Sequence, residues 1–265
     1  MPLAQPRYAW EGASMRLVGF MLVMMLSLSS SCSAAPARPA GVRVDHAALD
    51  SVLSAHVHPD GVDYAGLRAR SLGTLARYLD AMALVTAAAL PKRERDAFEI
   101  NLYNATMLRA VCDRLTPGWT PATDDFAVFK APLVRLKGRT LSLNQLENDM
   151  IRPRIRDPRV HVALNCAARS CPPLQPRAYR AATLDSVLEA NMSRFVRDPR
   201  QNTIDASKRR MRLSRLFDWY AADFGGAAAV PVYVAKRLAL PTSGWSAEFI
   251  DYDWSLAASA GTAVR

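Results

Sequence analysis

Apolar residues recur at helical spacing through much of the chain, while shorter stretches alternate or lie between turn residues. These two patterns distinguish amphipathic helices from half-buried strands. The predicted helices are residues 45–56, 75–90, 94–115, 142–152, 183–196, 211–224 and 230–240. The predicted strands are residues 62–64, 126–129, 134–136, 160–165 and 249–254. The sequence therefore predicts a single α+β domain in which several helices pack around a small, mostly antiparallel sheet.

The first 35 residues have the order of a secretory signal. Positive charge at Arg7 and Arg16 precedes an almost wholly apolar run at residues 17–28, and small residues follow it. A helix needs about 20 apolar residues to cross the hydrocarbon core, and this run is shorter. We therefore expect residues 1–35 to direct export from a start at Met1 or Met15, and we expect no transmembrane helix in the mature protein.

Cys32 offers a second way to process this segment. Residues 28–33 (LSSSCS) resemble a bacterial lipobox, although Ser29 stands where that motif usually has leucine or a similar residue. Lipidation of Cys32 would give a membrane-anchored lipoprotein, whereas ordinary cleavage near Ala35 would give a periplasmic protein. Residues 36–44 form a predicted tether rich in Ala and Pro, and residues 45–256 form the predicted globular domain.

The chain carries a formal net charge of +10. Its arginines and lysines are spread along the sequence, and aromatic residues are not interleaved with them as a stacking platform for bases requires. We therefore expect no nucleic-acid partner. In a cell envelope, a basic face favours anionic lipid, polysaccharide or acidic polymers through long-range attraction.

Three polar residues occupy positions where helical spacing calls for apolar ones. Asn104 lies on the apolar stripe of the third predicted helix with Asn101 beside it, and Glu147 lies on the stripe of the fourth. Buried amides must be hydrogen-bonded, so Asn101 and Asn104 either brace a loop or help to build a site. A buried Glu147 needs a partner such as a histidine, an arginine or backbone donors.

The predicted strand at residues 160–165 leads directly into a loop that contains two cysteines. Alternation places His161 on the face opposite the apolar side chains, and Cys166 and Cys171 follow in a C-x4-C spacing. In an exported protein the two sulfurs would form a disulfide across a tight loop. No metal site is expected, because Cys112 and His161 do not give a recognisable paired ligand spacing.

The alternative to a disulfide is nucleophilic catalysis. In this hypothesis Cys171 is the nucleophile, His161 is its base and Glu147 orients the imidazole. Cys171 is preferred to Cys166 because its Ser-Cys-Pro-Pro turn can present a thiol to solvent. Asn165 or nearby backbone N–H groups would stabilise the oxyanion.

Five segments of the chain resemble the family catalogued as domain of unknown function 547. They are VDY at residues 62–64, AFEINLYNA at 97–105, LENDMIR at 146–152, HVALNC at 161–166 and SCPPL at 170–174. Two departures are visible: Glu99 stands where the family often has tryptophan, and Asn148 where it often has histidine. The resemblance implies a distant relation to papain-like and transglutaminase-like thiol enzymes, with the order of the catalytic elements rearranged.

These observations predict an exported thiol-dependent hydrolase or acyl transferase that needs no cofactor. Its substrate would be an amide or ester in the cell envelope, in a peptide, in peptidoglycan or in an acyl conjugate. One alternative is a non-catalytic binding or scaffolding lipoprotein. Another is a thiol-disulfide exchange protein, although C-x4-C is wider than the C-x2-C spacing of thioredoxin-like proteins.

Overall fold

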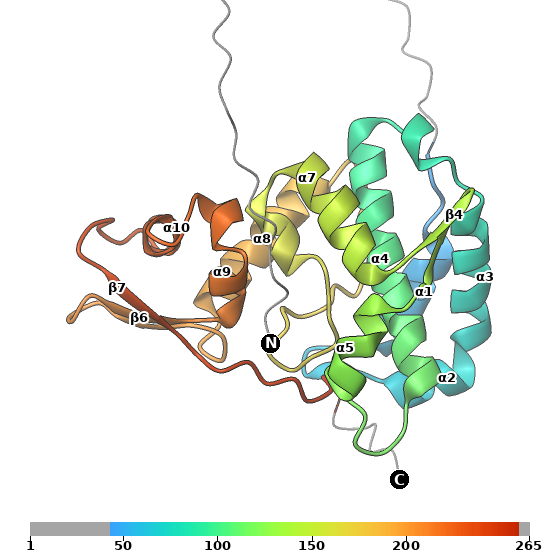
Figure 1. The fold of residues 1–265 in the computed structure, drawn as a ribbon, viewed down its shortest axis with the longest axis horizontal. Helices are drawn as coiled ribbons and strands as arrows, with labels where there is room; N and C mark the ends of the chain where they lie inside the picture. The colour runs from blue at the N-terminus through green and yellow to red at the C-terminus, as the bar shows by residue number, and fades with distance from the viewer. Residues whose placement is uncertain (1–42, 260–265) are drawn as a thin grey trace, which may run out of the picture. The chain divides into compact units, whose positions relative to one another are not determined.

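The long helix α4 (Lys92–Arg114) is the element around which the N-terminal half of the fold packs (Figure 1). Its residues from Asp96 to Cys112 are buried almost without interruption, as expected of a helix that lies inside a core. Helices α2 (Tyr64–Arg70) and α3 (Leu72–Ala83) pack against α4, and α1 (Ala47–His56) packs against both of them. The computed structural model describes residues 43–259, all of which belong to one compact unit.

A second group of short elements carries Glu147. In chain order after the short helix η1 (Ala87–Ala89) and α4, they are α5 (Thr123–Lys130), β3 (Val134–Leu136), β4 (Arg139–Leu141), α6 (Leu143–Gln145), the π-helix η2 (Leu146–Ile151) and α7 (Arg152–Ile155). A capping box starts the helical run, because Ser142 and Gln145 exchange side-chain and backbone hydrogen bonds of 3.1 and 2.9 Å. Helix η2 then packs against α4.

The C-terminal half has a hydrophobic cluster of its own, centred on Phe195 and Phe217. It is formed by α8 (Leu184–Arg197), β6 (Arg210–Leu213), α9 (Arg215–Trp219), the 3-10 helix η4 (Ala221–Phe224) and α10 (Ala229–Arg237). Figure 1 shows these elements together on one side, away from α1, α2 and α3. Val162 belongs to this cluster, whereas its neighbours Val160 and Ala163 belong to the cluster around α4. The segment that carries His161 therefore lies where the two clusters meet.

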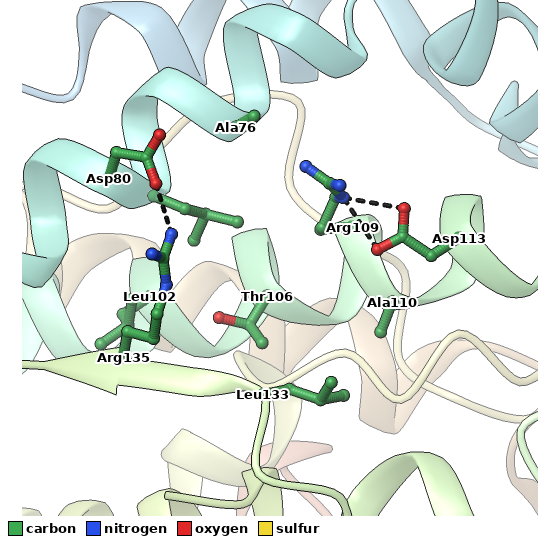
Figure 2. Close-up of a pocket in the computed structure, with 10 residues that line it drawn as sticks. Ala76, Asp80, Leu102, Thr106, Arg109, Ala110, Asp113, Leu133 and Arg135 are labelled. Carbon is green, nitrogen blue, oxygen red and sulfur yellow. Dashed lines mark hydrogen bonds and ion pairs between the residues drawn. The ribbon is translucent and has the colours of Figure 1, made fainter. Parts of the chain in front are cut away.

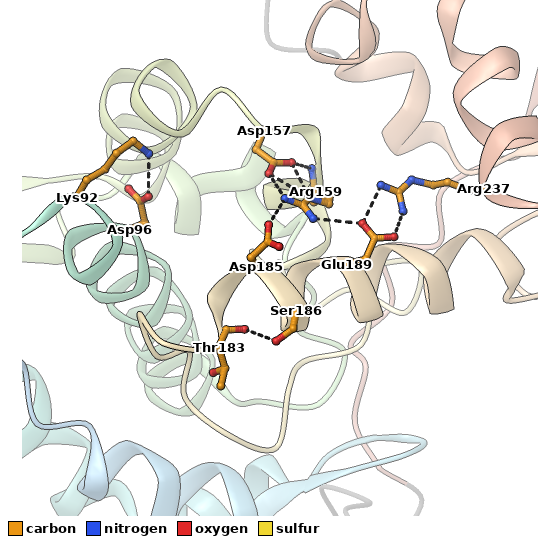
Figure 3. A network of polar contacts seen from close by, with 9 residues as sticks. All are labelled: Lys92, Asp96, Asp157, Arg159, Thr183, Asp185, Ser186, Glu189 and Arg237. Atoms are coloured by element: carbon orange, nitrogen blue, oxygen red, sulfur yellow. Dashed lines mark hydrogen bonds and ion pairs between the residues drawn. The ribbon is translucent and has the colours of Figure 1, made fainter.

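Ion pairs hold that segment against α8 and α10 (Figure 3). Arg159 bonds Asp157 at 2.7 Å, Asp185 at 2.7 Å and Glu189 at 3.2 Å. Glu189 also accepts hydrogen bonds from Arg237 on α10. The Arg237 hydrogen bond is the main reason why the pKa of Glu189 is lowered to about 2. Glu189 joins the two arginines, so the network holds the 3-10 helix η3 (Pro158–Val162), which contains His161, against α8 and α10.

The strands form three separate small sheets. β1 (Val57–His58) pairs with β2 (Gly61–Val62), and β3 pairs with β4, both antiparallel. β5 (Thr203–Asp205) pairs antiparallel with β6, and β7 (Ser246–Phe249) joins β6 in parallel. The predicted α+β class is confirmed, although the strands do not unite in one sheet.

Four predicted elements differ from the structure. Residues 160–165 are not a strand: Pro158 and the Asp157 cap start the 3-10 helix η3 there. Residues 126–129 belong to helix α5 rather than to a strand, and the last strand is Ser246–Phe249 rather than residues 249–254. Residues 211–224 begin as β6 before α9, because residues 210–213 alternate between exposed and buried as a strand does.

No helix among residues 43–259 is long and apolar enough to cross a membrane. The predicted signal segment and the lipidation site at Cys32 lie outside the described residues, as does most of the predicted tether at residues 36–44.

Candidate active site

The two cysteines lie in a loop that the C-terminal segment holds in place. The N–H of Arg169 donates to Ser255 O at 2.8 Å, and the N–H of Ala257 donates to Ala167 O at 2.8 Å. The loop also turns sharply, because Ala167 has a φ of +63° and the N–H of Cys171 bonds Ala168 O at 3.0 Å. These contacts bring residues 252–258 alongside the cysteines.

The two sulfur atoms lie next to each other as free thiols. The N–H of Cys166 donates to Cys171 Sγ at 2.9 Å, and Cys171 Sγ lies 3.9 Å from Leu164 O. Tyr252 Oη lies 3.2 Å from Cys166 Sγ. Sequence analysis did not identify Tyr252, because it lies 86 residues from Cys166 in the chain. The two thiols and the Tyr252 phenol therefore lie close together.

The surroundings of the two thiols make them chemically different. Burial raises the pKa of Cys166, but hydrogen bonds from Cys171, from Tyr252 and from the N–H of Ala168 outweigh it and lower that pKa overall. Burial, and then the Cys166 sulfur, raise the pKa of Cys171 well above its ordinary value. Cys166 is also half-buried, whereas Cys171 is 6% exposed. Thiolate character and access therefore both favour Cys166, although the sequence hypothesis named Cys171.

Asn104 and Asn165 support the cysteine loop through side-chain hydrogen bonds. Asn104 is 3% exposed; its Oδ1 accepts from the N–H of Asn165 at 2.9 Å, and its Nδ2 donates to Ala163 O at 2.8 Å. Asn165 itself donates to Pro172 O at 2.9 Å and accepts from the N–H of Ala167 at 3.0 Å. The predicted burial of Asn104 is confirmed, and its hydrogen bonds give it a loop-bracing position.

Asn101 braces a different stretch of chain. It is 1% exposed, as predicted from its position beside the apolar stripe. Its side chain exchanges two hydrogen bonds of 2.8 Å with the backbone of Tyr179. Asn101 therefore supports the segment that leads into α8 and makes no contact with the cysteines.

Glu147 is buried as predicted, but its partner is not the expected one. It lies in the π-helix η2, a rare form that is frequent at functional sites, and is 8% exposed. Its Oε1 accepts a hydrogen bond from Tyr220 Oη at 2.7 Å. Tyr220 and Glu147 are 73 residues apart, so no local pattern indicates this pair. The predicted hydrogen bond from Glu147 to His161 does not form.

His161 is held by Asp223 instead. Its side chain is 1% exposed, and its Nε2 lies 2.7 Å from Asp223 Oδ2. The same carboxylate oxygen accepts from Arg152 Nε at 2.9 Å. Although partial burial raises the pKa of Asp223, the hydrogen bonds from His161 and Arg152 outweigh it and bring the pKa to about 2. Asp223 is therefore an anion over the whole neutral range.

Tyr220 connects the two pairs. Its ring stacks on the His161 imidazole. Arg152 Cζ lies over the same ring, 4.7 Å from the ring centroid. Burial raises the pKa of Tyr220 well above its ordinary value, and the charges of Glu147 and Cys166 raise it further. The pKa of Tyr103, on α4, is raised by burial first and then by the same two groups. Tyr220 thus links the Glu147 carboxylate to the His161 imidazole.

Aromatic rings lie beside the thiol. Tyr252 contacts Trp254 at 4.6 Å and Trp219 at 4.8 Å between ring centroids, and the two indoles are 5.8 Å apart. All three side chains are partly exposed. The Cys166 sulfur therefore lies next to a half-buried apolar surface, which partly screens it from water.

A cavity of about 270 Å³ lies elsewhere, between α3, α4 and β3 (Figure 2). Ion pairs between Asp80 and Arg135 and between Arg109 and Asp113 line it. It contains no cysteine or histidine, and its cations are already paired. Among residues 43–259, no three His, Cys, Asp or Glu side chains are grouped so as to hold a metal ion.

Comparison with known proteins gives one family. Residues 87–196, which include Glu147, His161 and both cysteines of the loop, match the family model described as "Protein of unknown function, DUF547". No curated protein and no solved structure matches the chain significantly. The family expected from the sequence is therefore supported by a match over residues 87–196.

Proposed function

We propose that the protein is a thiol-dependent acyl-transfer enzyme with Cys166 as its nucleophile. The observation that carries the proposal is the half-buried Cys166 sulfur, which lies 3.2 Å from Tyr252 Oη and next to Cys171, and whose pKa is lowered by hydrogen bonds from Cys171, Tyr252 and the N–H of Ala168 despite burial. Donors aimed at a sulfur stabilise the thiolate, which is the nucleophilic form of cysteine. A solvated thiol with an ordinary pKa would be a much weaker nucleophile at neutral pH.

The reaction has two steps. The Cys166 thiolate attacks the carbonyl carbon of an amide or ester, and the amine or alcohol leaves with a proton, so that a thioester forms on Sγ. Water or a second nucleophile then attacks the thioester and restores the thiolate. The raised pKa of Tyr252, due mainly to burial, keeps its hydroxyl protonated, so it remains a hydrogen-bond donor to the developing oxyanion.

His161 is the proposed proton-transfer group. Asp223 fixes its Nε2, as the carboxylate of a catalytic triad fixes the imidazole. Glu147 is a positioning residue in this scheme, because it holds the hydroxyl of Tyr220, whose ring stacks on His161. Asn165 and Asn104 keep the cysteine loop in place, and Cys171 acts as a donor to the nucleophile.

Acyl-enzyme trapping tests this function. The full chain would be mixed with p-nitrophenyl acetate, quenched in acid and mapped by peptide mass spectrometry. We expect an acetyl thioester on Cys166 in the wild type and on Cys112 only after unfolding, since Cys112 is fully buried. His161→Ala should slow the turnover of the thioester. Acetylation of Cys171 or Cys112 in place of Cys166, or of no cysteine, would contradict the proposal.

We also propose that the enzyme acts in the cell envelope, on a peptide, on peptidoglycan or on an acyl conjugate. The support is the order of charged, apolar and small residues before Cys32 and the net charge of +10. Mass spectrometry of the exported protein tests the anchor. A diacylglyceryl group on an N-terminal Cys32 supports a lipoprotein, and a free N-terminus near Pro36 contradicts it.

A further inference from the structure

The paired thiols have a property that acyl transfer does not require. A nucleophilic cysteine needs hydrogen-bond donors, and backbone N–H groups or a hydroxyl can supply them. Here the neighbouring group is a second thiol, Cys171, whose sulfur accepts from the N–H of Cys166 at 2.9 Å. A thiol beside a stabilised thiolate can do what a hydroxyl cannot, which is to form a bond to an oxidised sulfur.

The two cysteines also differ in access. Cys166 is half-buried, so a small oxidant can reach it, whereas Cys171 is only 6% exposed. Susceptibility to oxidation follows thiolate character and exposure, and redox-sensitive cysteines often have a resolving cysteine nearby. The third described cysteine lacks both features: Cys112 is fully buried, and its pKa is raised to about 12, mainly by burial.

The loop is built so that the sulfurs stay together. The turn from Ala168 to Cys171 and the contacts with residues 253–257 fix both ends of the loop. A disulfide across it would replace the contact between Cys166 Sγ and Tyr252 Oη, which is made by side chains alone. The backbone–backbone hydrogen bonds of the loop involve neither sulfur, so disulfide formation does not consume them.

We propose that Cys166 is a modification site for hydroperoxides and that Cys171 is its resolving cysteine. In the first step the Cys166 thiolate attacks a peroxide oxygen; the O–O bond breaks, an S–O bond forms, and the alkoxide or hydroxide takes a proton from water. In the second step the Cys171 sulfur attacks the sulfur of the Cys166 sulfenic acid; the S–O bond breaks, the hydroxide takes the Cys171 proton and leaves as water, and an S–S bond forms. The peroxide is reduced by two electrons, and the two thiols are oxidised.

The disulfide would also switch off the proposed acyl transfer, because Cys166 would no longer carry a thiolate. This consequence rests on the proposed function, whereas the oxidation itself does not. A dithiol would reverse it by thiol-disulfide exchange. Resolution by Cys171 thus protects the nucleophile from irreversible oxidation to the sulfinic acid.

The test uses hydrogen peroxide on the reduced full chain, followed by peptide mapping with and without dithiothreitol. In the wild type and in Cys112→Ser we expect a bridge between Cys166 and Cys171, with alkylation of Cys166 falling about tenfold or more and returning after reduction. In Cys171→Ser and Cys171→Ala we expect sulfinic acid on Cys166, which dithiothreitol does not reverse. Unchanged thermal unfolding of these variants would show that they are folded.

Two results would overturn the inference: sulfinic acid on Cys166 in the wild type at the rate seen in Cys171→Ser, or no oxidation of Cys166 in either protein. The acyl-enzyme assay on the same samples separates the two proposals. A reversible bridge without acylation of the reduced enzyme supports the inference and contradicts the proposed function. Acylation of Cys166 without a bridge after peroxide contradicts the inference alone.

Discussion

The imidazole of His161 stacks on the ring of Tyr220 with centroids 3.8 Å apart and planes 21° from parallel. Each ring is tied to a different carboxylate, His161 to Asp223 and Tyr220 to Glu147, at 2.7 Å in both cases. Asp223 bonds the edge of the imidazole, and Glu147 bonds the hydroxyl of the tyrosine on which the imidazole stacks. This arrangement makes separate predictions for the two acids.

Tyr220→Phe should lower the free energy of unfolding by about 1–3 kcal/mol, because it leaves the buried Glu147 carboxylate without its donor. Tyr64→Phe is the matched control, since the Tyr64 hydroxyl is buried without a hydrogen-bond partner and its removal should be neutral or stabilising. Urea unfolding of both variants measures the difference. Equal losses in the two variants would show that the Tyr220 hydroxyl contributes nothing specific.

Asp223→Asn should lower the rate of acyl transfer by about 10²-fold or more, as loss of the acid does in other triads. Its amide cannot replace a carboxylate that accepts from both His161 and Arg152. Asp218→Asn is the control, because Asp218 forms an exposed ion pair with Arg215. Steady-state kinetics with an activated ester compares the two. The same rate in both variants would remove Asp223 from the mechanism.

Cys171→Ala should raise the pKa of Cys166, because the variant loses one of the three donors to that sulfur while burial persists. The rate of iodoacetamide alkylation of Cys166, followed against pH, should therefore move to higher pH. Cys112→Ala should leave the profile unchanged, since its nearest polar contact is Tyr64 O at 3.9 Å. A profile in Cys171→Ala that coincides with the wild type would show that the thiol-thiol hydrogen bond has no effect.

His46 predicts a loss of stability in mild acid. Its pKa is lowered to about 4, chiefly by burial and then by Arg180, so the folded protein keeps it neutral. The unfolded chain binds a proton near pH 6.5, so the free energy of unfolding should fall as the pH drops from about 6.5 to 4, by about 3 kcal/mol.

His46→Gln should flatten this decline, while His58→Gln, which changes an exposed histidine, should retain it. Chemical denaturation at several pH values between 7 and 4 provides the comparison. If both variants decline in parallel with the wild type, another group causes the acid sensitivity.

Local patterns predicted the parts of the site that depend on a single helix. Asn101, Asn104 and Glu147 are polar residues on or beside apolar helical stripes, and all three are buried. Burial follows from helical periodicity because one face of a helix must pack against the core.

Partners from distant parts of the chain could not be predicted in the same way. Tyr220 lies 73 residues from Glu147, Asp223 lies 62 residues from His161, and Tyr252 lies 86 residues from Cys166. Their contacts arise from packing of the C-terminal elements against the cysteine loop, which no local pattern encodes. The predicted strand at residues 160–165 failed for a local reason: a few alternating residues fit a strand, but Pro158 and the Asp157 cap favour a 3-10 turn.

Differential alkylation shows whether Cys166 or Cys171 is the reactive thiol. The reduced, folded full chain would receive a short pulse of iodoacetamide at neutral pH, and the carbamidomethyl group would be located by peptide mapping. We expect labelling of Cys166 well before Cys171 and Cys112, because Cys166 combines a lowered pKa with partial exposure. Labelling of Cys171 first, or of no cysteine until the protein is unfolded, would contradict it.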